Sequence, residues 1–429
     1  MTETPYPSPF VRWLTVAILF ILYIRSLADR YLIALVVEPI KRDLGISDFQ
    51  ISMLQGPAFA VLYCLCAVPV GLALDRFQRR WVLFLCVFVW SLGAAACGLA
   101  ASFLVLALAR SLVGGGEAGF STGAYSIVGD SFPPERVSLA MSVFVMGGVM
   151  GAGISFLLGG PMVGAVLAGD LSGWPLLADF KPWQQVFIIT GVPGALMAFL
   201  VFLFPEPARR RPATGAGYGE ALAFVGRSKR LFVAIFVGFG LIYTVTIALQ
   251  LWLPSYFARV HGWTPGRIGV VLGLAQVIAA LTLPLHGGIV DRLYRAGRRD
   301  AHLLWCLVTM ALAAPCAIAA LLVANPWASV VFFGLYMAFI LSTASMGPAA
   351  TQVVTPPQLR GRVSAIYVLV SGLIAMSVGP ALVGALTDKV LGDPKLVGVS
   401  LIIVVATVLT IAGLLLGAGR AQMRTLADA

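Results

Sequence analysis

The stretch GLALDRFQRR, residues 71–80, stands between two long apolar runs and decides how the rest of the chain is interpreted. A related stretch, GGIVDRLYR, occupies residues 287–295, so glycine, aspartate and two arginines recur at one offset (71 to 287, or 216 residues). A second echo joins FPPERVS at 132–138 to PPQLRGRVS at 356–364, where Arg-Val-Ser recurs. Two echoes in the same order indicate an internal duplication and predict two related halves.

Composition identifies the environment of these halves. Apolar residues make up 60% of the chain and charged residues only 11%, against roughly 25% charged residues in soluble domains. The mean hydropathy is +0.96. The 29 basic residues fall mostly in short gaps between apolar runs, where such charge orients a protein in a bilayer. We therefore expect an all-α polytopic membrane protein with no nucleic-acid partner.

Apolar runs long enough to cross a membrane occur twelve times, since a spanning helix needs about 20 such residues. The runs lie at 12–37, 51–74, 81–101, 103–128, 138–168, 183–204, 230–252, 267–290, 302–323, 327–350, 362–386 and 396–418. The longest polar interval divides them into two sets of six. The expected organisation is a six-helix bundle at 1–204, a linker at 205–229 and a second six-helix bundle at 230–429.

The distribution of basic residues predicts the orientation. With the N-terminus inside, 19 basic residues lie on the cytoplasmic side, 7 lie outside and 3 lie within helices. Cytoplasmic loops carry the excess of Lys and Arg, so both termini and the linker are expected in the cytoplasm. The first apolar run is too long for a signal peptide and is expected to be retained. We expect a multi-pass protein of a bacterial inner membrane that acts as a monomer.

This pattern resembles a known family across nearly the whole chain. Twelve helices in two halves, with Gly-x-x-x-Asp-Arg-x-x-Arg-Arg after the second helix, resemble the major facilitator superfamily. Within it, DRY at residues 29–31 and RSLVGGGEA at 110–118 resemble the spinster branch, whose eukaryotic members move sphingosine phosphate and lysophospholipids. Organic anion and proton symporters share an Asp-Arg in helix one and a Glu-Ala in helix four. The resemblance implies two pseudo-symmetric bundles and transport by alternating access about a midplane site.

Ionisable side chains within predicted spans are costly and usually face a cavity or a partner. The chain places five of them in its first half, namely Arg25, Asp29, Arg30, Arg110 and Glu117. From a rise of about 1.5 Å per residue, Asp29 matches Arg110 in depth and Arg25 matches Glu117. Arg30 points about 100° away from Asp29. The working hypothesis is that Asp29 holds Arg110 while Arg30 faces the cavity or Glu117; the alternative is a purely structural ion-pair network.

Asp29, Arg30, Arg110 and Glu117 are therefore the candidates for substrate binding or proton coupling. Glu117 could exchange protons as its arginine partners change between states. Arg30 or Arg110 would bind an anionic headgroup through the guanidinium fork. Further candidates for the cavity lining are Arg25, Tyr243, Thr246 and Gln250, although the last three could merely hydrogen-bond their neighbours.

The second half offers mainly apolar and weakly polar walls, so the expected substrate is an amphipathic anion such as a lysolipid. The alternative is a small carboxylate taken up with protons. Such transport needs no cofactor beyond the coupling proton, and the chain lacks the Gly-x-x-x-x-Gly-Lys-Ser/Thr motif that binds ATP phosphates.

The duplicated motif carries a separate expectation. The resemblance implies that its residues form a cytoplasmic latch that closes one face; the alternative is a tight, solvated loop with orienting charge. The latch residues are expected to be Gly71, Asp75, Arg76, Arg79, Asp291, Arg292 and Arg295.

Other functions find little support. All six cysteines lie in apolar runs without metal-ligand spacing, so no metal is expected. The three histidines lie near predicted helix ends, and His286 is expected to be an interfacial histidine with satisfied hydrogen bonds. An intramembrane enzyme would need a nucleophile and a base at membrane depth. A non-transporting sensor with this fold remains an alternative that only a flux measurement separates from a transporter.

Overall fold

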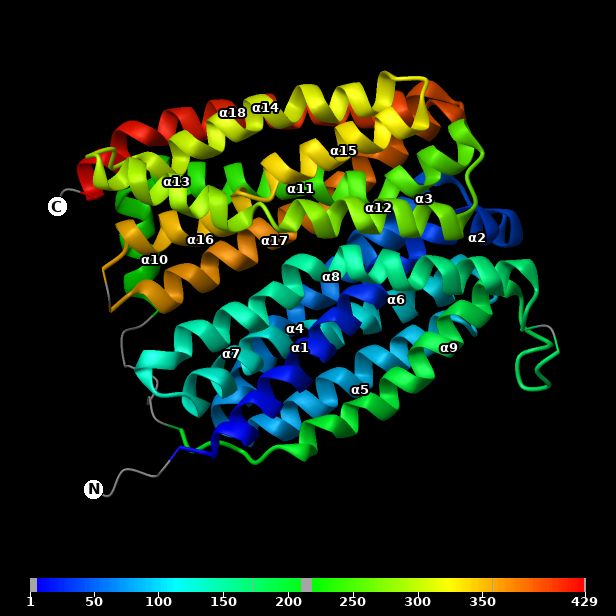
Figure 1. The fold of residues 1–429 in the computed structure, drawn as a ribbon, viewed down its shortest axis with the longest axis horizontal. Coiled ribbons are helices and arrows are strands. Elements are labelled where there is room, and N and C mark those ends of the chain that lie inside the picture. Colours follow the sequence, from blue (N-terminus) through cyan, green and yellow to red (C-terminus); the bar gives the residue numbers. More distant parts are fainter. Residues whose placement is uncertain (1–5, 172, 210–217, 357, 428–429) are drawn as a thin grey trace. The chain divides into compact units, whose positions relative to one another are not determined.

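The computed structural model describes residues 6–171, 173–209, 218–356 and 358–427. Those residues form helices and connecting turns with no β-strand among them, and twelve helical spans in them are long and apolar enough to cross a membrane. Figure 1 follows the chain from the blue N-terminal helices to the red C-terminal helix. The predicted all-α polytopic fold is confirmed.

The chain divides into two compact units, residues 1–213 with 263–273 and residues 214–262 with 274–429. The first contains α1 (Pro9–Tyr31), α2 (Val37–Leu44), α3 (Asp48–Gln55), α4 (Pro57–Arg76), α5 (Arg79–Cys97), α6 (Phe103–Glu117), α7 (Phe120–Ser131), α8 (Pro134–Ala168) and α9 (Pro182–Met197). After α10 (Tyr218–Arg227) come α11 (Lys229–His261), α12 (Pro265–Ala280), α13 (Leu283–Arg295), α14 (Ala301–Leu322), α15 (Pro326–Ile340), α16 (Thr343–Val354), α17 (Arg360–Ala385) and α18 (Val397–Ala427).

Local sequence sets many of these boundaries. The side chain of Ser47 accepts a hydrogen bond from the backbone nitrogen of Gln50, and the side-chain oxygen of Gln50 accepts one from the backbone nitrogen of Ser47, so a capping box starts α3. Ser102 caps α6 by accepting from the backbone nitrogen of Val105. At the other end, Gly262 ends α11 with a φ of 63°, a conformation that glycine adopts without steric cost.

Each unit repeats the same helix pairings. In the first, α1 packs on α8, and α5 packs on both α6 and α9. In the second, α11 packs on α17, and α14 packs on both α15 and α18. These pairs join the first span to the fifth and the third span to the fourth and sixth within each unit, so the duplication found in the sequence extends to the packing.

Several spans are broken where the sequence predicts one continuous helix. The expected helix at 103–128 consists of α6 and α7, which are separated by Ala118 and Gly119. The glycines of α6 explain how it packs before this break. A Cβ atom on Gly116 would lie 2.5 Å from the backbone nitrogen of Trp90 in α5, and one on Gly114 would meet the carbonyl oxygen of Phe59 in α4. The backbone of α6 therefore lies directly against both neighbours, which small residues permit in membrane proteins.

Candidate functional site

The five ionisable side chains singled out within the spans lie in the first unit, on α1 and α6. Burial is nearly complete for Asp29, Arg110 and Glu117, which are 2%, 1% and 5% exposed. Both helices end at this level: α1 ends at Tyr31 and continues as a 3-10 turn (Leu32–Leu35), and α6 ends at Glu117. The charged groups are therefore held near two helix ends inside one bundle.

Arg30 and Glu117 form a direct ion pair. The Nη2 of Arg30 donates to Oε2 of Glu117 at 2.5 Å. The guanidinium carbon of Arg30 also lies 4.5 Å from the ring centroid of Phe59 and 6.0 Å from that of Tyr63, at cation-π distance. Arg30 thus stands between a carboxylate and an aromatic wall supplied by α4.

Asp29 makes a different set of contacts from the predicted ones. Its carboxylate pairs with Arg25, four residues earlier on the same helix, with Oδ1 2.6 Å from Nη1. Arg25 also donates to the carbonyl of Thr190 in α9. The expected ion pair between the carboxylate of Asp29 and Arg110 is absent from these described contacts, and that part of the hypothesis is corrected.

Arg110 instead binds backbone carbonyls. Its Nη1 donates to the main-chain oxygen of Asp29 at 2.8 Å, and its Nε donates to that of Leu54 at 3.3 Å. The reason lies in the ends of the two helices, since the last four carbonyls of a helix have no partner within it. Asp29 lies in the last turn of α1 and Leu54 in the last turn of α3, so Arg110 joins the ends of both helices.

Several buried polar atoms of this cluster have no hydrogen-bond partner among the described residues. Within the described residues, no hydrogen bond reaches Oδ2 of Asp29, Oε1 of Glu117 or Nη2 of Arg110. A buried charge that is only partly paired is costly, and such a network is weak evidence for stability. The arrangement leaves donors and acceptors available to a proton, a water molecule or an anionic ligand.

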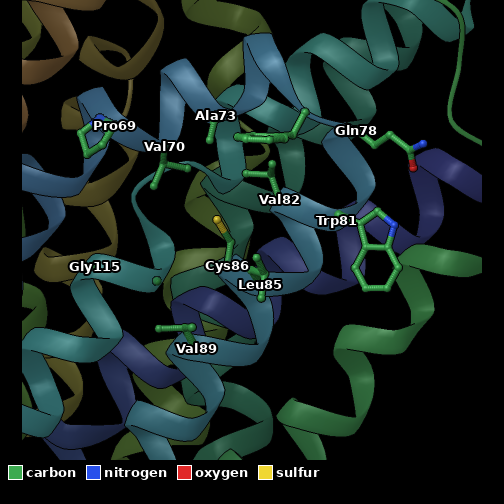
Figure 2. Close-up of a pocket in the computed structure, with 12 residues that line it drawn as sticks. Pro69, Val70, Ala73, Gln78, Trp81, Val82, Leu85, Cys86, Val89 and Gly115 are labelled. Atoms are coloured by element: carbon green, nitrogen blue, oxygen red, sulfur yellow. The ribbon is translucent and has the colours of Figure 1, made fainter.

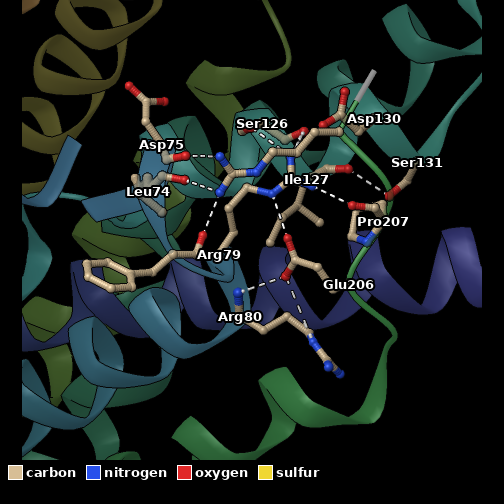
Figure 3. A network of polar contacts seen from close by, with 12 residues as sticks. Leu74, Asp75, Arg79, Arg80, Ser126, Ile127, Asp130, Ser131, Glu206 and Pro207 are labelled. Carbon is tan, nitrogen blue, oxygen red and sulfur yellow. Dashed lines mark hydrogen bonds and ion pairs between the residues drawn. The ribbon is translucent and has the colours of Figure 1, made fainter. Parts of the chain in front are cut away.

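A second network surrounds Arg79, which belongs to the duplicated motif (Figure 3). Arg79 is buried and donates to Asp130 at 2.5 Å, to Glu206 at 2.8 Å and to the carbonyl of Pro207 at 2.6 Å. Glu206 also accepts from the backbone nitrogen of Arg80 at 3.1 Å. The motif therefore ties α5 to the end of α7 and to the start of the linker.

Arg209 extends this network by capping α4. Its guanidinium donates to the main-chain oxygens of Leu74 at 2.7 Å and Phe77 at 2.5 Å, and to that of Asp75. It thus satisfies carbonyls that the end of α4 leaves free. Arg210 and Arg211, the rest of the basic run, lie outside the described residues.

The second copy of the motif is built differently. Asp291, Arg292 and Arg295 are exposed, and Arg295 donates only to the main-chain oxygen of Asp291, at 3.2 Å. A buried carboxylate is paired instead, where Asp300 accepts from the partly exposed Arg420 at 2.7 Å and from the exposed Arg424 at 2.9 Å. Burial alone would raise the pKa of Asp300, but hydrogen bonds from these two arginines outweigh burial, so its pKa lies below the ordinary value.

The candidate lining residues of α11 are engaged within their own unit. Gln250 donates to Gln276 at 3.2 Å, and the hydroxyl of Thr246 lies 3.2 Å from that of Tyr336. Tyr243 donates to the carbonyl of Thr343 at 3.5 Å. These bonds agree with the alternative that these residues hydrogen-bond their neighbours, and a role in the cavity stays a prediction.

His286 is satisfied, as expected. Its Nδ1 accepts from the indole of Trp305 at 3.1 Å, and its Nε2 lies 2.9 Å from the carbonyl of Ala338. These contacts fit the neutral tautomer with the proton on Nε2. Across the part of the chain that the structure describes, no group of three or more His, Cys, Asp or Glu side chains could hold a metal.

The acidic partners of Arg79 and the cluster at Asp300 were not found by sequence reasoning. A signal for Glu206 existed, since it directly follows the sixth apolar run beside the basic stretch. Asp130 lies two residues beyond the predicted fourth run, 103–128, and was not considered as a partner of Arg79. Asp300 lies 120 residues or more before Arg420 and Arg424, and no local pattern connects it to them.

Comparison with known sequences decides the family. The family model described as Major Facilitator Superfamily matches residues 19–380, which is most of the chain. The chain belongs to this superfamily. Facilitator proteins of this kind are transporters and not enzymes, which agrees with the expectation from the sequence. The protein is accordingly an integral, multi-pass membrane transporter.

Two relatives refine the comparison. This facilitator is 29% identical over 410 residues to an MFS-type efflux pump of Mycolicibacterium smegmatis, covering 93% of this chain and 90% of the relative. It is 26% identical over 397 residues to Protein spinster of Drosophila melanogaster, covering 89% of this chain but 62% of the fly protein's length. The predicted resemblance to the spinster branch is confirmed.

The fold matches solved facilitator structures. A bacterial homologue of the human lysosomal transporter Spinster, in an inward-facing and unoccupied conformation, superposes with a TM-score of 0.82 at 24% identity, covering 98% of both chains. A D-xylose-proton symporter superposes with a TM-score of 0.68 at 15% identity, covering 92% of this chain and 97% of the symporter. At these identities the likeness supports the fold alone.

Proposed function

We propose that this facilitator is a proton-coupled transporter of an amphipathic, lysolipid-like anion. The observation that carries the proposal is the buried ion pair of Arg30 with Glu117 beside the partly unpaired Arg110. A carboxylate and two guanidinium groups inside a membrane bundle are costly, and such groups usually serve an ion or substrate pathway.

The proposed cycle couples a proton to an anion through Arg30. When Glu117 is charged, its carboxylate forms an ion pair with the guanidinium of Arg30. When Glu117 takes up a proton, the attraction weakens, and the fork of Arg30 becomes available to a phosphate or carboxylate. An anion at Arg30 and a proton at Glu117 then favour each other, and this coupling is reciprocal.

The amphipathic part of the proposal rests on the distribution of charge. Ionisable residues within the spans lie in the first half, so a headgroup would bind there and an apolar tail would meet apolar walls. Phe59 and Tyr63 flank Arg30, which gives the headgroup site an aromatic edge. The resemblance to the spinster branch, whose eukaryotic members move lysophospholipids, implies the same class of substrate.

A small organic anion is the second candidate. It is favoured by a 26% identical relative named as a hexuronate transporter of Bacillus subtilis, aligned over 384 residues with 86% of this chain and 87% of the relative covered. A guanidinium fork binds a small carboxylate as well as a phosphate. The two candidates differ in whether the substrate has an apolar tail.

The remaining expectations join the proposal. The linker side is proposed to face the cytoplasm of a bacterium, with the protein in the inner membrane as a monomer. The network around Arg79 is proposed to act as the cytoplasmic latch together with Asp75, because it ties three elements of that side together. The exposed residues Asp291, Arg292 and Arg295 would contribute only when the other face is open.

A flux assay separates the two substrates. Purified protein in proteoliposomes is given labelled lysophosphatidylglycerol or labelled glucuronate, with the other compound as competitor. We expect uptake of the lysolipid, no inhibition by glucuronate, and at least tenfold slower uptake by Arg30→Gln. The exposed Arg227→Gln, an arginine of α10 that belongs to neither copy of the motif, is the matched control and should transport normally. Glucuronate uptake that the lysolipid leaves unaffected would support the second candidate instead.

A further inference from the structure

A groove on the first unit lies apart from the charged site. It runs between α4 and α5, and its floor is formed by Gly115 and Gly116 near the end of α6. The groove encloses about 730 Å³, which is within the range of ligand pockets. Figure 2 shows Gln78 and Trp81 at one end, with Pro69, Val89 and Gly115 toward the other. The groove therefore follows α5 from the linker side toward the middle of the bundle.

Its length matches one leaflet of a bilayer. From Gln78 to Val89 the chain advances eleven positions, about 17 Å at 1.5 Å per residue. The hydrocarbon core of a bilayer is about 30 Å thick, so one leaflet supplies roughly half of that. One acyl chain that enters from the linker side would reach about as far as Gly115.

The walls are apolar and open toward lipid. Leu85 is 54% exposed and Phe77 is 58% exposed, although both line the groove. At the floor, a Cβ atom on Gly115 would lie 3.4 Å from the sulfur of Cys66, so the missing side chain leaves room there. Both helices belong to spans long and apolar enough to cross a membrane, so an apolar opening on their outer face suits hydrocarbon better than water.

The mouth of the groove is positively charged. The guanidinium of Arg76 lies 5.9 Å from the ring centroid of Phe77, and within the described residues no carboxylate or carbonyl pairs with it. Trp81 and Gln78 add an indole and an amide at the same end (Figure 2). The bound guanidiniums of Arg80 and Arg209 contribute further positive charge nearby.

Three carboxylates lie near this end and need to be weighed. Asp130 is occupied by Arg79. Glu206 is occupied by Arg79 and by the backbone of Arg80. Asp75 is exposed, and Figure 3 shows its carboxylate pointing away from the network. Arg76 follows Asp75 by one residue and so points about 100° from it on the helix. Arg76 is exposed at the end of α4, where its cation is accessible to a lipid phosphate.

We propose that the groove binds one acyl chain of a two-chain anionic phospholipid of the bilayer, with the phosphate held at Arg76. Arginine beside an apolar surface at the membrane boundary fits an anionic headgroup with its attached chain. The bound molecule is a resident lipid and not the cargo. On the side toward the charged site, Gly116 lies against the backbone of Trp90 and Gly114 against that of Phe59, so the proposal places close backbone packing between the groove and Glu117.

A photo-crosslinking experiment tests the proposal on the full chain in lipid nanodiscs. The probe is phosphatidylglycerol with a diazirine midway along one acyl chain, and labelled residues are mapped by mass spectrometry. We expect labelling of Val70, Leu85 and Val89 above that of other lipid-exposed side chains. Unlabelled phosphatidylglycerol should displace the probe, whereas phosphatidylcholine should not.

Matched variants sharpen the result. Leu85→Trp fills the groove and should abolish its labelling, whereas Leu92→Trp, on the same helix and 44% exposed, does not line it and should have no effect. Arg76→Gln should lower labelling about fivefold, as expected for one basic group at an anionic surface. Arg292→Gln, its counterpart in the duplicated motif, should leave labelling unchanged.

Three results would overturn the proposal, and each can be read from the wild-type protein alone. Even labelling of all lipid-exposed helices would mean ordinary annular lipid. Equal displacement by phosphatidylcholine would remove the headgroup site at Arg76. Preferential displacement by lysophosphatidylglycerol would make the groove part of the transport path, and this outcome is independent of whether the proposed proton coupling holds.

Discussion

Arg30 and Glu117 meet at 2.5 Å where α1 and α6 both end. A helix C-terminus carries partial negative charge, which stabilises Arg30 at the end of α1 and opposes a charged Glu117 at the end of α6. The carboxylate of Glu117 therefore depends on Arg30 for its stability. A change in either partner, by a proton or by a competing anion, alters the contact between two broken helices.

The first prediction concerns this pair. Arg30→Gln leaves a buried carboxylate without its cation and should destabilise the protein by about 3 kcal/mol or more, because removing one partner of a buried pair strands the other charge. Adding Glu117→Gln should recover most of that loss. Thermal unfolding of the two single variants and the double variant measures the coupling. If the double variant also transports normally, the pair is only structural.

A second prediction compares two adjacent glycines of α6. A Cβ atom on Gly116 would lie 2.5 Å from the backbone nitrogen of Trp90, whereas one on Gly115 would lie 3.4 Å from the sulfur of Cys66. Gly116→Ala should therefore cost about 1–3 kcal/mol through overpacking. Gly115→Ala should be nearly neutral. Equal unfolding temperatures for the two variants would contradict the direct backbone contact between α5 and α6.

A third prediction contrasts the two copies of the motif. Arg79 is buried and bonded to two carboxylates, so Arg79→Ala should destabilise the protein by about 3–5 kcal/mol. Arg295 is exposed and donates only to its own helix, so Arg295→Ala should cost less than about 1 kcal/mol. Denaturation in detergent measures both. Similar losses would mean that the copies are structurally equivalent.

The fourth prediction concerns pH. Because the pKa of Asp300 is lowered in the folded protein, its stabilising contribution is present above the unfolded pKa and is lost as pH falls through the folded pKa. The loss should occur below about pH 4, given an ordinary Asp value of about 3.9. Asp300→Asn should lower the unfolding temperature at pH 7, and this effect should shrink progressively as the pH falls below about 4. The exposed Asp291→Asn serves as control, and an effect of Asp300→Asn that is equal above and below about pH 4 would contradict the account.

Much of the fold could be predicted because its signals are local. The number of spans follows from the apolar runs, and the division into two halves follows from the long polar interval between them. The repeat at residues 71–80 and 287–295 indicates the family. None of these signals requires knowledge of packing. Helix breaks escaped prediction, since Glu117 and Phe120 belong to one uninterrupted apolar pattern. The break depends on how the glycines of α6 meet α4 and α5, which is a tertiary property.

The candidate site was predicted in its members and only partly in its contacts. Helical direction predicted that Arg30 faces the cavity or Glu117, and the structure pairs it with Glu117. The depth estimate matched Glu117 with Arg25 instead, but Arg25 pairs with Asp29. The same reasoning assigned Arg110 to the carboxylate of Asp29. It failed there because α1 ends at Tyr31, which frees the carbonyl of Asp29 for Arg110 and leaves the carboxylate to Arg25.

Gradient-driven accumulation by Glu117→Gln tests the central claim most directly. The assay uses proteoliposomes with an imposed pH gradient and whichever probe the wild type transports, lysophosphatidylglycerol or glucuronate. The control is Glu220→Gln, because Glu220 is an exposed residue of α10. We predict that wild type and control accumulate the probe against its gradient, whereas Glu117→Gln only equilibrates it. Full accumulation by Glu117→Gln would contradict the proposed coupling of proton and anion at Arg30.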